Sequence, residues 1–233
     1  MMDLNPFVIL ANPIYSQMLF DGLRMTFVVA IGSWVLAMGL GVALLGLRLT
    51  GNRIAEWVVV IYISYHQNVP TLVQLVLWYF GVSSLLPAPM QDWLSNHNAE
   101  AIFAVIGLGL CQAAYFSEDL RSGLRSISIG QTEAARALGH GYFGTMRDVL
   151  MPQAFRNALP ALVNHTVSLF KNSSLAMAIG VVEVMHAVTE VESLSFRTFD
   201  TYFIATLIYL ICSLGLMLIG AWLNKRLRLS EAR

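Results

Sequence analysis

Residues 25–47 read MTFVVAIGSWVLAMGLGVALLGL, a stretch without a single charged side chain. A helix of about 20 mostly apolar residues crosses the ~30 Å hydrocarbon core of a membrane, and it satisfies its own backbone amides where no water is available. Four more stretches have this character, and Lys171 is the only charged side chain within them: residues 57–80, 101–117, 158–182 and 201–224. The sequence therefore predicts an all-α membrane protein with five transmembrane helices, in one domain over residues 1–233.

The composition agrees with lipid as the surrounding solvent. Charged residues make up only 12% of the chain, against roughly a quarter in an ordinary soluble domain. No Lys or Arg precedes Arg24, so the first apolar stretch lacks the cationic start of a cleaved signal, and we expect a permanent helix. Cys111 and Cys212 lie inside apolar stretches at no metal or disulfide spacing, so we expect packing residues and no metal site. The formal net charge is zero, and we expect no nucleic-acid partner.

The Lys and Arg residues are unevenly distributed between the connections. Except for Arg24, Lys171 and Arg197, all of them follow the first, third or fifth apolar stretch. Cytoplasmic connections of membrane proteins are enriched in Lys and Arg. This distribution predicts an N-terminus outside the membrane and a cytoplasmic C-terminus, which requires an odd number of spans, such as five.

Four glycines interrupt the first apolar stretch: Gly32, Gly39, Gly41 and Gly46. Small residues let neighbouring helices approach closely within a membrane. We therefore expect the first helix to pack inside the bundle.

The third connection is about 40 residues long, far longer than the usual link between packed helices, so we expect it to have structure and a role of its own. The run from Gln131 to Leu138 is rich in helix-forming residues, and Gly139 supplies a stop. A second short amphipathic helix is expected from about Phe143 to Leu150, ending before Pro152. Two short helices joined at Gly139, within residues 128–152, predict a compact protrusion on the cytoplasmic face.

Several motifs in this connection carry a resemblance. Glu133-Ala134-Ala135, then Gly139, then Leu150-Met151-Pro152 resembles the EAA loop of ABC-importer permeases, and residues 130–135 with 152–154 resemble the polar amino acid subfamily. Other motifs agree in order along the chain: Gly22 to Thr26, Asn68 to Gln74 and Lys171 to Leu175. The resemblance implies a type I ABC-importer permease fold, multi-pass in a bacterial inner membrane.

The resemblance also implies partners. In that family the loop docks on an ATP-binding subunit, which makes Glu133, Ala134, Ala135, Arg136 and Gly139 the expected coupling contact. A complete importer would pair this chain with a second permease, identical or homologous, two ATPase subunits and a periplasmic or extracellular amino-acid-binding protein. This chain has no G-x-x-x-x-G-K-[ST] motif, so we expect ATP and Mg²⁺ on the ATPase partner, and no cofactor or catalytic residue in this subunit.

Lys171 is the outstanding feature of the fourth apolar stretch. A Lys at the centre of a span costs about 2.5–3.5 kcal/mol on insertion scales, so it is paired, solvated or functional. The following Asn172, Ser173 and Ser174 favour capping and predict an interruption of the helix. A restarted half-helix would expose amide N–H groups, which together with Lys171 form a candidate site for an amino acid's α-carboxylate. The alternative is that Lys171 snorkels or pairs with a carbonyl, while the serines mediate helix packing.

The second apolar stretch has a matching irregularity at Pro70, which either kinks the helix or opens it for function. Asn68 and Gln74 beside it are further pathway candidates. The family commonly shows Arg-Gly-Thr-Pro at this place, whereas this chain reads Gln67-Asn68-Val69-Pro70, which places an arginine-based role in doubt. We expect His66 and His165 to be packed or hydrogen-bonded, because neither has partners at ligand spacing.

The motifs at Asn68 and Lys171 are similar to those of glutamate/aspartate permeases. The spans hold a cation and no carboxylate, which favours an acidic substrate, whereas Glu183 just beyond the fourth stretch leaves a cationic substrate open. Glutamine, arginine, histidine or an opine are alternatives for the same machinery. An ATP-independent carrier is the alternative outside it, although five spans are too few for the usual inverted repeat. An intramembrane enzyme is disfavoured because H-E-x-x-H and G-x-S-x-G motifs are absent.

Overall fold

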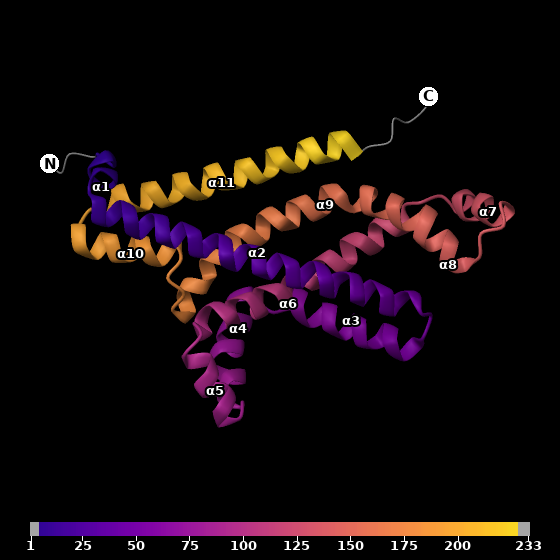
Figure 1. Ribbon diagram of the computed structural model, residues 1–233, viewed down its shortest axis with the longest axis horizontal. Coiled ribbons are helices and arrows are strands. Elements are labelled where there is room, and N and C mark those ends of the chain that lie inside the picture. The colour runs from indigo at the N-terminus through magenta and orange to yellow at the C-terminus, as the bar shows by residue number, and fades with distance from the viewer. Residues whose placement is uncertain (1–4, 228–233) are drawn as a thin grey trace.

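The computed structural model describes residues 5–227, and within that range it contains helices and no strand (Figure 1). Four long helices run lengthwise through the molecule: α2 (Pro13–Leu49), α6 (Ala99–Arg125), α9 (Met151–Asn172) and α11 (Thr198–Leu227). Shorter α-helices complete it: α1 (Phe7–Ala11), α3 (Arg53–Asn68), α4 (Thr71–Val76), α5 (Ala88–Ser95), α7 (Ile129–Ala137), α8 (Tyr142–Gly144) and α10 (Val184–Ser195). Two π-helical turns, η1 (Leu77–Val82) and η2 (Thr145–Leu150), and a 3₁₀ segment, η3 (Ser173–Ile179), join them.

The core is centred on α6, which packs between α2 and α9. Gly32 and Gly41 of α2 lie against Val105 and Phe116 of α6, where a Cβ atom would come within 3.0 and 3.1 Å of those side chains. A Cβ atom at Gly39 or Gly46 would have no neighbour within 4 Å. The predicted interior position of the first helix is therefore confirmed at two of its glycines, and the other two face away from the described residues.

Three helices are long and apolar enough to cross a membrane: α2, α6 and α11. The bent pair Tyr142–Ile179 and Val184–Ser195, with 54° between its halves, makes up to four. The count of five spans stays a prediction.

The second apolar stretch, residues 57–80, is interrupted at Pro70, where the sequence predicts an irregularity. Helix α3 ends at Asn68, Val69 is extended with φ −97° and ψ 130°, and Pro70 precedes α4. Proline disfavours the helical conformation of the residue before it and supplies no N–H of its own. The chain therefore turns at this point, and α4 and α5 project sideways from the bundle (Figure 1).

The helix of the fourth apolar stretch, predicted over residues 158–182, begins earlier than expected, and α9 ends at Asn172, where the sequence predicts an interruption. Helix α9 already starts at Met151, and the chain passes from it into η3 without leaving helical geometry. The Oγ atoms of Ser173 and Ser174 donate to the carbonyls of Phe170 and Lys171 at 2.7 and 2.8 Å. These i to i−3 bonds accompany a tightening of the helix to 3₁₀ geometry, and the change of direction follows at residues 180–183.

The connection between α6 and α9 contains the two short helices that the sequence predicts. Helix α7 ends at Ala137, and Gly139 adopts φ +87°, a left-handed conformation that suits glycine. The expected end of the second helix before Pro152 is wrong. The chain runs from α8 through η2 directly into α9, because Pro152 occupies the first turn of α9, where no N–H has to be donated.

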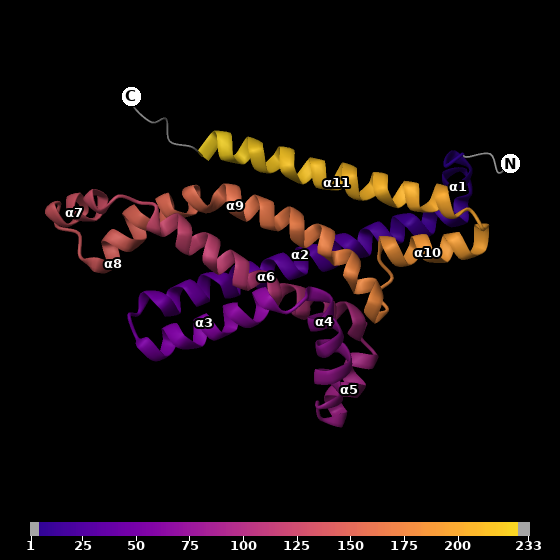
Figure 2. The same ribbon diagram turned by 180° about the vertical axis from the view of Figure 1, so that it is seen from behind.

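The connections rich in Lys and Arg gather at one end of the molecule. The α2–α3 turn, the α6–α9 loop (residues 126–150) and the end of α11 all point toward one end, while α1 and α10 lie at the opposite end (Figures 1 and 2). Arg48, Arg53, Arg125, Arg147 and Arg226 belong to what we call the cation-rich end. Arg228 and Arg233 lie outside the described residues.

Candidate functional site

Two interruptions of the helices lie beside one another in the fold. Segment η3 packs against α4, which begins just after the break at Pro70. Leu75 of α4 and Ala176 and Ile179 of η3 share one buried hydrophobic cluster. The fold therefore brings together the two stretches in which the sequence places its pathway candidates.

Gln74 stabilises the break in the second apolar stretch. Its side chain is fully buried, and its Nε2 donates to the carbonyls of Val69 at 2.7 Å and His66 at 3.1 Å. Its Oε1 lies 2.5 Å from the His66 Nδ1. These bonds satisfy backbone carbonyls that a continuous helix would have paired. Gln74 thus uses its hydrogen-bonding groups within the chain, and it lines no surface open to a solute.

Lys171 lies in the last turn of α9 with its side chain exposed, and Asn172 is half-exposed after it. Among the ion pairs of residues 5–227, none includes Lys171. Ser173 is buried and Ser174 half-exposed, while Asn68 is exposed and its Nδ2 donates to the Ser64 carbonyl at 2.7 Å. If this stretch spans a membrane, an exposed charge cannot face hydrocarbon without a cost, so we expect the Lys171 ammonium to reach water, the membrane interface or another chain.

The expected exposed amide groups after Lys171 are not found there. The next helix N-terminus belongs to α10, and Glu183 caps it by accepting from the His186 N–H at 3.0 Å. Thr26 Oγ1 accepts from the Val184 N–H at 3.2 Å. Because chain atoms already occupy these donors, the expectation of a free half-helix N-terminus beside Lys171 is wrong.

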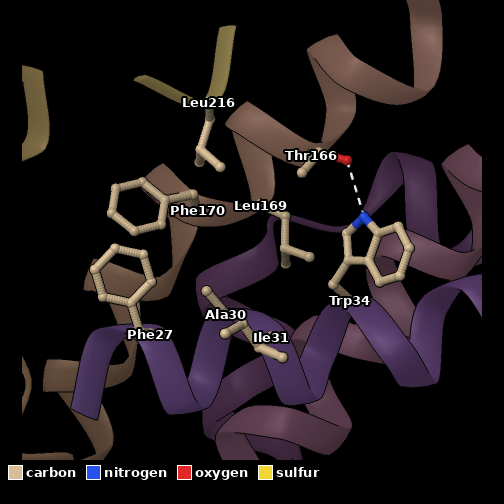
Figure 3. A pocket seen from close by; sticks show the side chains of 8 residues that line it. All are labelled: Phe27, Ala30, Ile31, Trp34, Thr166, Leu169, Phe170 and Leu216. Carbon is tan, nitrogen blue, oxygen red and sulfur yellow. Dashed lines mark hydrogen bonds between the residues drawn. The ribbon is translucent and has the colours of Figure 1, made fainter. Parts of the chain in front are cut away.

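An apolar groove of about 320 Å³ opens between α2, α9 and α11 (Figure 3). Phe27, Ile31, Leu169 and Phe170 are among the side chains that line it. Trp34 Nε1 donates to Thr166 Oγ1 at 3.0 Å and so closes off one of the few polar atoms near the groove. None of the described side chains that line the groove is charged, so it offers no ion pair to a polar solute. In this respect it differs from the part of α9 that carries Lys171.

The α6–α9 loop presents apolar side chains at its surface. Glu133, Ala134, Arg136 and Gly139 are exposed, whereas Ala135 is buried. Sequence reasoning missed the most prominent groups around them, which are four large, exposed apolar side chains: Leu138 (82% exposed), Phe143 (76%), Ile129 (76%) and Tyr142 (61%). Apolar residues on both sides of Gly139, in a loop with many polar groups, are the signal that identifies them. Exposed apolar clusters of this kind mark interaction surfaces.

Hydrogen bonds tie the loop to the bundle. Gln153 Nε2 donates to Gln131 Oε1 at 3.3 Å, and Asn157 Nδ2 donates to Ser126 Oγ at 2.8 Å. The first bond links α7 to α9, and the second links the start of the loop to α9. A movement of the loop would therefore be transmitted to α9, which carries Lys171 and packs against α6 in the core.

The histidines and cysteines have structural environments. His66 packs between the rings of Tyr62 and Tyr65, and His165 Nδ1 lies 2.6 Å from Asp119 Oδ2, which confirms the expectation for both histidines. Cys111 is buried and unpaired by a disulfide. Residues 5–227 contain no cluster of metal-ligating side chains.

Comparisons with known proteins identify relatives over nearly the full length of the chain. The arginine transport system permease protein ArtQ of Bacillus subtilis is 32% identical, over 91% of this chain and 94% of ArtQ. The glutamate/aspartate import permease protein GltJ of Escherichia coli K12 is 28% identical, over 94% of this chain and 90% of GltJ. The crystal structure of an amino acid ABC transporter with histidines matches with a TM-score of 0.81 at 27% identity, covering 94% of this chain and 98% of that chain.

The family model described as "binding-protein-dependent transport system inner membrane component" matches residues 35–229. This match includes the break at Pro70, Lys171 and the whole α6–α9 loop. The chain therefore belongs to the family of inner membrane components of binding-protein-dependent transport systems.

Proposed function

We propose that this chain is the permease subunit of an ATP-driven ABC importer that carries a polar amino acid across a bacterial inner membrane. The observation that carries the proposal is the α6–α9 loop, an exposed apolar surface at the cation-rich end that hydrogen bonds tie to α9. The chain acts as a transport component, and a separate ATPase pair supplies ATP, Mg²⁺ and hydrolysis. A second permease and an external amino-acid-binding protein complete the assembly, as the family's description as a binding-protein-dependent system supports.

The loop is the proposed contact with the ATPase. Leu138, Tyr142 and Phe143 offer apolar area to a partner, and the exposed Glu133 and Arg136 surround it with charges. Burial of exposed apolar side chains contributes about 1.5–3 kcal/mol each, enough for a few such residues to anchor a contact. Gly139 sets the angle between α7 and α8, so movement of the ATPase would reach α9 through this bend.

The topology we propose has five spans, with α3 to η1 and α9 to α10 as the two interrupted ones. The cation-rich end is cytoplasmic by the positive-inside rule, and the N-terminus lies outside. Arg48 of α2 and Arg121 of α6 both pair with Glu118, so at this end α2 and α6 are held together by charge. This ion pair between α2 and α6 would stabilise the base of the α6–α9 loop when the ATPase moves it.

The proposed pathway runs past Lys171, Asn172, Ser174 and Asn68. The exposed ammonium of Lys171 would attract a carboxylate of the substrate. From the interior, Ser173 bonds to the Phe170 carbonyl beside Lys171, and Gln74 bonds to the backbone at the Pro70 break. Glutamate or aspartate is the substrate that this chemistry favours. Glu183, which leaves a cationic substrate open on sequence grounds, is fully buried with both carboxylate oxygens hydrogen-bonded to the chain, so it offers nothing to such a substrate. Glutamine, arginine, histidine and opines are outcomes that a competition experiment distinguishes.

Uptake of labelled glutamate by the assembled transporter tests the proposal, with excess unlabelled aspartate, glutamine, histidine and arginine as competitors. We expect uptake only with the ATPase and binding protein present, and competition by aspartate. Lys171→Ala should abolish uptake at normal levels of inserted protein, while Lys171→Arg, which keeps the charge, retains part of it. Uptake without the ATPase would reject the ABC assignment, and normal uptake by Lys171→Ala would reject the site.

A further inference from the structure

Glu183 is a buried carboxylate at the point where the interrupted fourth span resumes as α10. Its side chain is 0% exposed. One oxygen, Oε1, accepts from the backbone N–H of His186 at 3.0 Å, and the other, Oε2, accepts from the Tyr209 hydroxyl at 2.8 Å. The first bond caps α10 and the second reaches α11. One side chain therefore joins two helices that are separated in the chain by a turn.

Helix α2 completes the junction. Thr26 Oγ1 accepts from the Val184 N–H at 3.2 Å and donates to the Gly22 carbonyl at 3.0 Å. Gly22 lies so close to α10 that a Cβ atom there would come within 3.0 Å of the Ala187 Cβ. The start of α10 is thus held by α2 on one side and α11 on the other. We call Glu183, Tyr209 and Thr26 the α10 junction.

The α10 junction connects to the end of α9 through aromatic contacts. The ring of Tyr209 packs against Phe170 with centroids 5.8 Å apart, and Phe170 packs against Phe27 of α2 at 5.5 Å. Phe170 immediately precedes Lys171. Any displacement of Tyr209 would therefore change the packing of the residue next to the proposed pathway cation.

Burying a carboxylate is costly unless hydrogen bonds satisfy it, and a buried ionisable group is weak evidence for stability alone. A shorter cap such as Asp or Ser would satisfy the α10 amides equally well. The longer Glu side chain adds the reach to Tyr209 on another helix. The geometry of Glu183 is therefore that of a link between helices, beyond what a cap requires.

From these contacts we infer that Glu183 is a positioning residue for transport. As a double hydrogen-bond acceptor, it holds the start of α10 against α2 and α11, and through Tyr209 and Phe170 it fixes the orientation of the end of α9. Glu183 does not touch the substrate, because protein encloses it. The part of the inference that concerns Lys171 rests on the proposed function, whereas the part that concerns the position of α10 does not.

The transport test compares Glu183→Ala with Glu183→Gln and Tyr209→Phe in the assembled transporter in membranes, at matched amounts of inserted protein. Gln keeps the length of Glu and an oxygen that accepts from the His186 N–H, and its amide can also bond to Tyr209. We expect Glu183→Gln to keep the KM for uptake near that of the unmodified chain. Glu183→Ala, which removes both hydrogen bonds, should raise the KM by on the order of tenfold or more, and Tyr209→Phe, which removes one of them, should raise it less.

A second readout reports the position of α10 without transport. In a background with Cys111→Ala and Cys212→Ala, a Val184→Cys substitution places a thiol at a position with 0% exposure. We expect a maleimide to label it slowly with Glu183 or Glu183→Gln, and rapidly with Glu183→Ala. If Glu183→Ala fails to assemble, Tyr209→Phe with the same thiol replaces it.

Three results would overturn the inference. The first is an unchanged KM together with unchanged labelling in Glu183→Ala, or in Tyr209→Phe where that variant replaces it. The second is labelling as fast in Glu183→Gln as in Glu183→Ala. The third is a loss of uptake as severe in Glu183→Gln as in Glu183→Ala. The last would show that the charge is required and not the hydrogen bonds. Normal uptake by Lys171→Ala would reject the proposed site but leave the expected labelling unchanged, so the two failures are distinguishable.

Discussion

Gly123 of α6 lies directly against the backbone of Ala154 on α9: a Cβ atom at position 123 would come within 2.3 Å of the Ala154 carbonyl oxygen. It would also come within 2.9 Å of the Ala158 Cβ. These two helices flank the α6–α9 loop. Their close approach gives the loop a rigid base, because neither helix has a flexible side chain that can yield at this contact.

Gly123→Val should therefore force α6 and α9 apart. We expect a loss of about 1–3 kcal/mol of stability, typical of overpacking, together with reduced uptake. Thermal unfolding of the purified protein in detergent measures it. Gly39→Ala is the matched control, because it lies inside α2 with no neighbour within 4 Å and should be neutral or slightly stabilising. Equal stability of Gly123→Val and the unmodified chain would contradict the close packing.

Gln74→Leu should destabilise the break at Pro70. The substitution introduces an apolar side chain of similar size and removes the Nε2 donor to the carbonyls of His66 and Val69. The His66 carbonyl keeps only the weak contact with the Cys111 thiol at 3.7 Å, and we expect a loss of about 1–3 kcal/mol, the cost of a buried polar group left unsatisfied. Gln67→Leu, at an exposed position seven residues earlier in the chain, is the control and should change the unfolding temperature little. A Gln74→Leu protein as stable as this control would show that Gln74 is not needed to hold the turn.

Gly139→Val should uncouple ATP hydrolysis from transport. Its φ of +87° is strained for a β-branched residue, so the bend between α7 and α8 would relax to another geometry. The ratio of amino acid transported to ATP hydrolysed measures the effect, and we expect that ratio to fall several-fold. Gly130→Ala, within α7 and without neighbours, should leave it unchanged. A normal ratio in Gly139→Val would count against the bend as the coupling element.

The parts of the fold that the sequence predicts are those that local chemistry decides. The apolar run of α2 and the stop of α7 at Gly139 depend on neighbouring residues only, and both are confirmed. The irregularity at Pro70 is predicted from local chemistry too, but an apolar window does not show whether the proline only kinks the helix or redirects the chain. The end of α9 at Asn172 agrees with the predicted interruption, but the sharp change of direction comes only at residues 180–183. The serine hydroxyls bond back to the preceding turn, and the chain continues as a 3₁₀ segment.

The candidate site was predictable in part for a related reason. Lys171 is visible in the sequence as a lone cation in an apolar stretch, and the structure leaves it exposed. The roles of Gln74 and Glu183 depend on which segments the fold brings beside them, His66 and Val69 in one case and Tyr209 in the other. The exposure of Leu138 and Phe143 likewise depends on how the loop folds, although the apolar residues around Gly139 in the sequence indicate an interaction surface.

The most direct test of the central claim, that the α6–α9 loop is the ATPase contact, is photo-crosslinking from the loop. In the background with Cys111→Ala and Cys212→Ala, a benzophenone maleimide is attached to Leu138→Cys or, as the control, to Leu85→Cys. Leu138 lies on the loop and is 82% exposed, and Leu85 lies between η1 and α5 and is 83% exposed. We predict a crosslink to the ATPase subunit from Leu138→Cys, and none from Leu85→Cys. Crosslinking to the ATPase from Leu85→Cys, or its absence from Leu138→Cys in an assembled and active transporter, would contradict the account.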